Sequence, residues 1–204
     1  MKALILIDIQ NDFLPGGALA VPEGDVVIPL ANRVQPLFDL VVATQDCHPA
    51  DHSSFAAQHA NRRPGDVIEL DGLQQILWPV HCVQGSHGWE FVTSLHRHAW
   101  KEVFAKGTDP RIDSYSGFFD NGHRKSTGLG DYLQRHGAQE VYIMGLATDY
   151  CVKFTAIDAC DLGFSTFVIE DGCRGVNLQP GDADRALSEM QSAGARRIFS
   201  ESLL

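Results

Sequence analysis

Short apolar runs alternate along the chain with segments whose apolar residues recur at helical spacing. The runs are rich in β-branched and aromatic residues, which is typical of buried strands. Gly163 and Gly194 follow two of the helical segments and act as stop signals. The pattern predicts strands at residues 2–7, 40–44, 102–105, 141–144, 165–169 and 197–199, and helices at 26–37, 150–162 and 182–193. A fourth helix is predicted to be capped by Ser126 and to end near residue 136.

Strands that alternate with helices need crossover connections between them. This predicts an α/β fold with a six-stranded, mostly parallel sheet and helices on both faces. Residues 49–100 are irregular and rich in His, Pro, Gly and Trp, so we expect loops with short helices there. So long an irregular segment is uncommon in a compact domain unless it is functional. No linker or repeat interrupts the pattern, and residues 1–204 are predicted to form one domain.

Composition excludes several classes of partner. The chain has 204 residues and a formal net charge of -10, which argues against a nucleic-acid surface. It contains no basic run that would favour a membrane surface and no apolar stretch long enough to span a bilayer. The apolar run at the start ends at Asp8 without a cleavage signal, so we interpret it as the first strand. The five cysteines of the chain lack Cys-x-x-Cys spacing, which predicts free thiols and a cytoplasmic location.

Chemically capable side chains lie at the ends of four predicted strands. Asp8, Asp46, Lys106 and Cys151 each come at or just after the carboxyl end of a strand. In open α/β sheets, ligands bind at this edge. We therefore expect these four side chains to share one site.

Cys151 lies where a strand is predicted to hand over to the first turn of a helix. Backbone N–H groups and the helix dipole favour a thiolate at such a position, and thiolate is the nucleophilic form. The same N–H groups could hold an oxyanion on an attacked carbonyl. The alternative is a small buried core residue, which is the commoner fate of a free cysteine.

A thiol needs a base or a positive neighbour to react at neutral pH. Asp8 could accept the proton of the Cys151 thiol and later return it to a leaving amine. Lys106 could stabilise the thiolate and the carboxylate together. Their alternatives are a cap at a strand end for Asp8 and a solvated cation for Lys106.

A second group of residues is typical of a metal site. Asp46 and His48 are two residues apart, so on an extended strand end their side chains point to the same face. With His52 and, farther on, His81, they offer imidazole and carboxylate ligands that suit zinc, with manganese or iron less favoured. Because the chain has nine histidines, a coincidental cluster is the alternative.

Three aromatic residues belong to loops near these predicted sites. Phe13, Trp78 and Tyr115 all lie in turn-rich sequence. Aromatic side chains are more often part of the core, but here they are consistent with the walls of a small flat pocket.

Sequence blocks along nearly the whole chain carry a family pattern. They lie at residues 8–13, 16–21, 45–49, 52–56, 78–83, 106–107, 113–118, 145–152 and 171–176. Taken together, they resemble nicotinamidases, the pyrazinamide-hydrolysing members of the cysteine-hydrolase (isochorismatase-like) superfamily. The resemblance implies a six-stranded parallel sheet with helices on both faces. It also implies conversion of nicotinamide to nicotinate and ammonia through a thioester, and hydrolysis of pyrazinamide.

The resemblance assigns roles to particular residues. It implies an Asp–Lys–Cys triad at Asp8, Lys106 and Cys151, and a cis peptide before Ala147. The N–H groups of Ala147 and Cys151 would then form the oxyanion hole. Phe13, Trp78 and Tyr115 would surround the pyridine ring. The metal that binds the ring nitrogen would be held by Asp46, His48 and His81. His52 lies where some relatives add a fourth ligand.

Two features depart from the family pattern. Cys47 replaces the usual bulky aromatic residue between two metal ligands, and its side chain should point away from them. The segment 25–40, which contains the first crossover, looks shorter than in relatives.

Other functions within the superfamily are alternatives. A ureido or carbamoyl amidase needs no metal, an isochorismatase proper lacks the nucleophilic cysteine, and an inactive relative would only bind its ligand. The residue set favours a nicotinamidase that acts on a small molecule. Enzymes of this size are often symmetric homo-oligomers, which is the expectation for its assembly.

Overall fold

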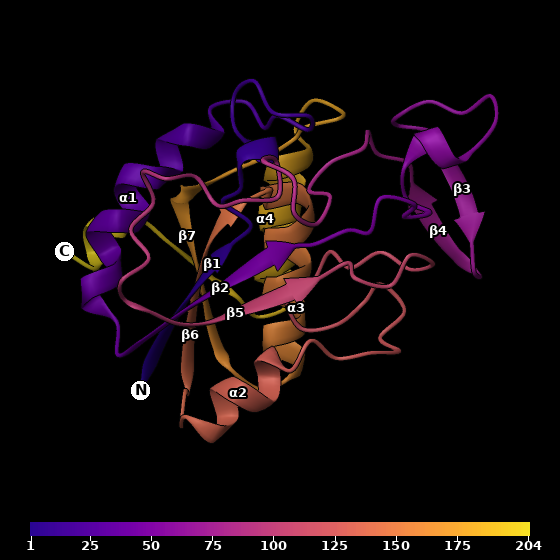
Figure 1. Ribbon diagram of the computed structural model, residues 1–204. Helices are drawn as coiled ribbons and strands as arrows, with labels where there is room; N and C mark the ends of the chain where they lie inside the picture. Colours follow the sequence, from indigo (N-terminus) through magenta and orange to yellow (C-terminus); the bar gives the residue numbers. More distant parts are fainter.

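The computed structural model describes residues 1–204, and a six-stranded sheet forms its centre (Figure 1). The strand order is β5-β2-β1-β6-β7-β8, and each neighbouring pair is parallel. The predicted fold class is therefore confirmed, with a sheet that is parallel throughout. The strands are β1 (Lys2–Ile7), β2 (Leu40–Asp46), β5 (Trp100–Lys106), β6 (Glu140–Leu146), β7 (Ser165–Arg174) and β8 (Arg196–Ile198).

Helices cover both faces of this sheet. Helix α1 (Val27–Val34) lies on one face, and α3 (Lys153–Asp161) and α4 (Asp182–Ser192) lie together on the other (Figure 1). Helix α1 buries a stripe of apolar residues at helical spacing, which is the reason that this segment is helical. No helix in the structure has the length and apolar character needed to cross a membrane.

The fourth helix begins later than predicted. Helix α2 spans Leu129–Arg135, and Gly128 occupies its N-cap position. The Ser126 hydroxyl instead accepts a hydrogen bond from the Gly128 N–H in the turn before the helix, so its predicted role as the cap is wrong.

Residues 49–100 contain a β-hairpin where we expected only loops and short helices. Strands β3 (Val67–Leu70) and β4 (Leu73–Ile76) pair antiparallel and project away from the main sheet (Figure 1). Asp71 and Gly72 form the connection, and their φ angles of 51° and 82° are both positive. Positive φ at both central residues is typical of the type I′ hairpin turn. The one short helix in this segment is the 3₁₀ turn Ala56–Gln58.

Strand β7 is also longer than predicted and continues to Arg174. The apolar run ends at Ile169, so the polar residues that follow hide the extension from sequence analysis. The pairing of β7 with β6 shifts its register between Ile143 and Gly145. This irregularity lies at the carboxyl end of β6.

The strand order brings four carboxyl ends together. From β1, the chain builds the sheet outward through β2 and β5 on one side and through β6, β7 and β8 on the other. Such a reversal of direction opens a crevice at the carboxyl ends of the central strands. Gly145 allows β6 to approach β1 closely, because a Cβ there would lie 2.2 Å from the carbonyl oxygen of Ile7. The edge of β5, β2, β1 and β6 is therefore the expected place for a site.

Candidate active site

Three of the predicted residues meet at this edge. The Lys106 ammonium lies 2.9 Å from Oδ2 of Asp8 and 3.4 Å from Sγ of Cys151. Asp8 follows β1, Lys106 ends β5, and Cys151 follows β6. All three side chains are buried. An acid, a cation and a thiol in contact can share and transfer a proton.

Burial dominates the electrostatics of this group. It raises the pKa of the Asp8 carboxyl above its ordinary value, although Lys106 opposes the shift. Burial also works against the charged form of Lys106, but the attraction of Asp46 and Asp8 outweighs it and raises the pKa of the ammonium well above its usual range. The ammonium is therefore a fixed positive charge, and the raised pKa makes the carboxylate form of Asp8 a stronger proton acceptor.

The Cys151 thiol differs from the sequence prediction. We expected a helix terminus to favour its thiolate, but burial raises the pKa of Cys151 well above its ordinary value, and Lys106 only partly opposes this. Cys151 also does not begin an α-helix, because it belongs to a π-helical turn (Thr148–Val152) that precedes α3. The thiol thus rests protonated, and its activation requires a base.

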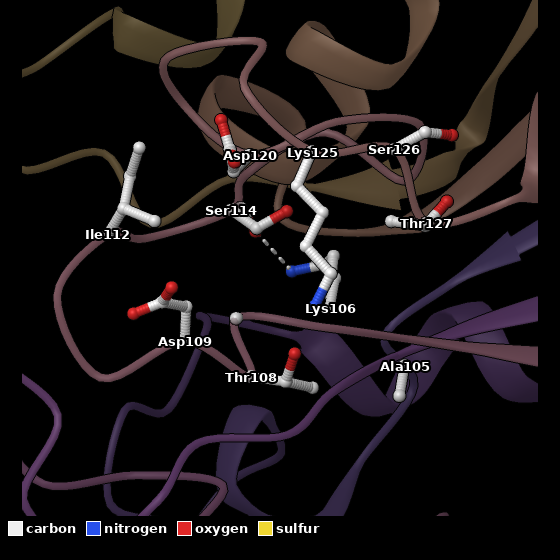
Figure 2. Close-up of a pocket in the computed structure, with 11 residues that line it drawn as sticks. Ala105, Lys106, Thr108, Asp109, Ile112, Ser114, Asp120, Lys125, Ser126 and Thr127 are labelled. Atoms are coloured by element: carbon white, nitrogen blue, oxygen red, sulfur yellow. Dashed lines mark hydrogen bonds between the residues drawn. The ribbon is translucent and has the colours of Figure 1, made fainter.

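Two further contacts hold the acid and the lysine in place. The hydroxyl of Thr44 donates to Oδ1 of Asp8 at 2.7 Å and leaves Oδ2 facing Lys106. The Lys106 ammonium also donates to the carbonyl of Ser114 at 3.0 Å, in the wall of a polar hollow (Figure 2). This hollow is lined by neither Asp8 nor Cys151, so we do not assign substrate to it.

Asp46, His48 and His81 converge as predicted. Oδ2 of Asp46 lies 3.1 Å from Nε2 of His48 and 3.3 Å from Nε2 of His81. Ligand atoms held about 2.0–2.1 Å from a tetrahedral zinc ion lie roughly 3.3 Å from one another. The three atoms therefore have the spacing of a metal site.

Hydrogen bonds of the two rings support a cation at this point. Nδ1 of His48 lies 3.0 Å from the carbonyl oxygen of Gly107, and Nδ1 of His81 lies 2.8 Å from that of Pro79. A carbonyl only accepts, so each Nδ1 carries a proton and each Nε2 faces the Asp46 carboxylate, the orientation in which an imidazole can offer Nε2 to a metal. A divalent ion satisfies all three atoms at once, and the residues fit such an ion.

Backbone geometry positions these ligands. Gly107 has a φ of 65°, and a Cβ there would lie 2.5 Å from the His48 ring, so glycine leaves the space that the ring fills. The side chain of Gln10 accepts from the N–H of Asp46 at 2.8 Å and donates to its carbonyl at 2.9 Å. Gln10 thereby fixes the end of β2.

His52 lies beside this set but has partners of its own. Its Nδ1 is 2.8 Å from the hydroxyl of Ser54, and its ring is 4.3 Å from that of His48. With His48 and Asp113 it forms a second close group of ligand atoms. Cys47 belongs to neither group.

A cavity with aromatic walls borders both groups of residues, the Asp8–Lys106–Cys151 group through Cys151 and the metal-ligand group through Asp46 and His81. It is lined by all three predicted aromatic residues, by Ala147 and Cys151, and by Asp46 and His81. The peptide bond before Ala147 is cis, as the resemblance implied. Sequence analysis missed the remaining lining residues, which are Leu19, Asp113, Tyr150 and Val176. All four stand inside the sequence blocks that carry the family pattern, which was the one signal that could have identified them.

Comparisons with known proteins agree with this geometry. Residues 2–202 match the isochorismatase domain family. A nicotinamidase of Escherichia coli is 54% identical over 198 residues, which are 95% of this chain and 92% of the relative. A solved structure of an Acinetobacter baumanii nicotinamidase and pyrazinamidase has a TM-score of 0.97 and 46% identity, with 100% of this chain and 98% of that one covered. A pyrazinamidase of Pyrococcus horikoshii in complex with zinc has a TM-score of 0.78 and 40% identity, with 97% and 98% covered.

Proposed function

The chain belongs to the isochorismatase domain family, and we propose that it hydrolyses nicotinamide to nicotinate and ammonia through a thioester on Cys151. The observation that carries this proposal is the position of the Cys151 thiol. It lines an aromatic cavity, 3.4 Å from Lys106, and Asp46 and His81 line the same cavity. Pyrazinamide has a ring of the same shape and is the expected second substrate.

The first half of the reaction forms the thioester. Asp8 takes the proton of the Cys151 thiol as the sulfur attacks the amide carbon, and the Lys106 ammonium balances the negative charge of the reacting groups. The N–H groups of Ala147 and Cys151 hold the oxyanion. Asp8 then returns the proton to the amide nitrogen, which leaves as ammonia.

The second half releases the product. Asp8 takes a proton from water, the water oxygen attacks the thioester carbon, and the Cys151 sulfur leaves and is protonated again. We infer zinc at Asp46, His48 and His81, since two imidazoles and one carboxylate with open positions are typical of catalytic zinc sites. The ion, when bound, would act as a Lewis acid toward the ring nitrogen of the substrate.

The test is ammonia release from nicotinamide by the purified protein. We expect equal amounts of ammonia and nicotinate, and at least about a tenfold loss of rate after chelation, restored by zinc. Activity that ignores the chelator would remove the metal from the proposal. No release from nicotinamide with zinc supplied would overturn it in favour of a ureido or carbamoyl amidase.

Thr44→Val is expected to move the acid limb of the kcat/KM profile to higher pH. Asp8 must be ionised to accept the thiol proton, so activity falls as the pH drops through the pKa of Asp8. The Thr44 hydrogen bond lowers that pKa, and its loss raises it. Because a buried carboxylate oxygen loses its donor, we also expect a loss of about 1–3 kcal/mol in the free energy of unfolding. The measurements are a pH–rate profile and urea denaturation.

Thr166→Val is the matched control. Thr166 is a buried threonine of β7 whose hydroxyl donates to the carbonyl of Phe164, away from the site. This variant should lose stability and keep the wild-type acid limb. If the two variants share one pH profile, Thr44 does not tune Asp8.

A further inference from the structure

Gln75 is a buried amide in the hairpin that projects from the sheet (Figure 1). Only 4% of Gln75 is exposed, whereas its neighbour Gln74 points to the opposite side of β4 and is exposed. The Nε2 group of Gln75 lies 3.1 Å from the hydroxyl of Tyr115 and 3.2 Å from Oδ2 of Asp113. Its third acceptor, at 2.6 Å, is the carbonyl of Ile76.

These contacts reach the substrate cavity through other residues. Tyr115 and Asp113 both line the cavity, and Gln75 does not. The Tyr115 hydroxyl also accepts a hydrogen bond at 3.0 Å from Nε1 of Trp78, which is another wall residue. The phenol oxygen is therefore held from two sides, by an indole and by an amide.

The three aromatic rings of this wall are packed edge to face. The Trp78 ring lies 6.4 Å from that of Tyr115 at 87°, and 4.8 Å from that of Tyr150 at 89°. In such packing the edge of one ring lies against the face of the next, and Tyr115 is in addition stacked on Phe154, so each ring limits the rotation of its neighbour. A small rotation of Tyr115 would therefore change the width of the cavity that receives the flat ring of the substrate.

We propose that Gln75 is a positioning residue that fixes the Trp78–Tyr115 wall and the Asp113 carboxylate, and thereby sets the affinity for a flat aromatic amide. The inference rests on the proposed function and deepens it. An amide NH₂ group has two hydrogens, so its bonds to Tyr115 and Asp113 compete with the one to the backbone. Gln75 thus joins the hairpin to the cavity without touching the substrate.

The test compares Gln75→Leu with Gln74→Leu. Leucine keeps most of the volume and removes the donors, and Gln74 has the same chemistry on the exposed side of the same strand. For Gln75→Leu we expect KM for nicotinamide to rise about tenfold, the factor that matches one ordinary hydrogen bond, with kcat within about twofold. Gln74→Leu should keep both constants.

A double-mutant cycle identifies the route of the effect. In a Tyr115→Phe background the hydroxyl is gone, so Gln75→Leu should raise KM by less than about threefold further. Equal effects in both backgrounds would show that Gln75 does not act through Tyr115. A fall in melting temperature with wild-type KM would make Gln75 only a structural contact of the hairpin. Either result overturns the proposal.

A measurement without substrate separates this inference from the proposed function. The packing of Trp78 and Tyr115 contributes to the near-ultraviolet circular dichroism of the ligand-free protein, together with the other aromatic residues. We expect Gln75→Leu to weaken this signal and Gln74→Leu to keep it. If the wild-type protein fails to hydrolyse nicotinamide but the signal changes as expected, the wall is still fixed by Gln75 and only the substrate is wrong. An unchanged signal contradicts the positioning role.

Discussion

Replacing Cys151 by alanine is expected to lower the turnover of nicotinamide by about 10⁴–10⁶-fold, as for nucleophiles of related covalent mechanisms. The substitution removes the only sulfur that contacts Lys106 and lines the cavity. It leaves the aromatic wall and the metal ligands in place, so nicotinate should still bind. The measurements are ammonia release and calorimetric titration with nicotinate.

Cys160→Ala provides the control on the same stretch of chain. Cys160 is a half-buried residue of α3, two turns beyond the nucleophile, and it lines none of the cavities described. Its variant should turn over nicotinamide like the wild type. Ammonia release that persists in Cys151→Ala would refute the thioester mechanism.

Asp8→Asn is expected to lower turnover by about 10³–10⁴-fold, near the upper range for general acid–base catalysis, because Asp8 transfers a proton in both halves of the reaction. An amide cannot accept the proton of a thiol whose pKa is itself raised by burial. The residual activity should lack the acid limb of the wild-type pH profile, because the carboxyl group that titrates there is gone. Single-turnover and steady-state rates between pH 4 and 9 test this.

Asp158→Asn is the matched control for a buried carboxylate. Burial also raises the pKa of Asp158, whose Oδ2 lacks a partner, and it lies on α3 outside the cavity. An amide should be tolerated here, with unchanged turnover. If Asp8→Asn loses no more activity than this control, Asp8 is not the base.

The positions of the site residues at the carboxyl ends of strands were predictable, because the pattern of apolar runs that marks a strand is local. Buried parallel strands give continuous apolar runs, and Asp8 follows one of them, whereas Lys106 ends a short apolar run on the largely exposed edge strand β5. The order of the strands was not contained in that pattern. The meeting of Asp8 with Lys106 follows from β2 lying between β1 and β5, which only the folded sheet shows.

The hairpin was missed although it carried a signal. Asp71-Gly72 between two short runs with apolar residues is a strong local indication of a hairpin turn, but the strands β3 and β4 have only four residues each and are half exposed. Polar neighbours also hid Gln75, whose partners Asp113 and Tyr115 lie about 40 residues further along the chain. Its role depends on tertiary contacts and has no sequence pattern.

The pKa of Cys151 also depends on tertiary contacts that the sequence pattern does not contain. A strand followed by a helix predicts a favourable dipole for a thiolate. The burial of the thiol, which reverses that expectation, depends on tertiary packing that the local pattern does not contain. Likewise, the spacing of Asp46 and His48 is local, whereas His81 joins them through a loop. Family resemblance supplied that third ligand more firmly than spacing did.

The central position of β1 has a consequence for the assembly of the enzyme during synthesis. Its neighbour β2 follows early, but Ile7 pairs with Gly145 of β6, so the other edge of β1 stays open until more than two thirds of the chain has been made. An open, apolar strand edge invites pairing with other chains. Closing such a distant contact is also slow, as for any fold of high contact order. Recovery of activity after refolding should therefore report the last step of assembly, and nascent chains that end before β6 are the form most exposed to aggregation.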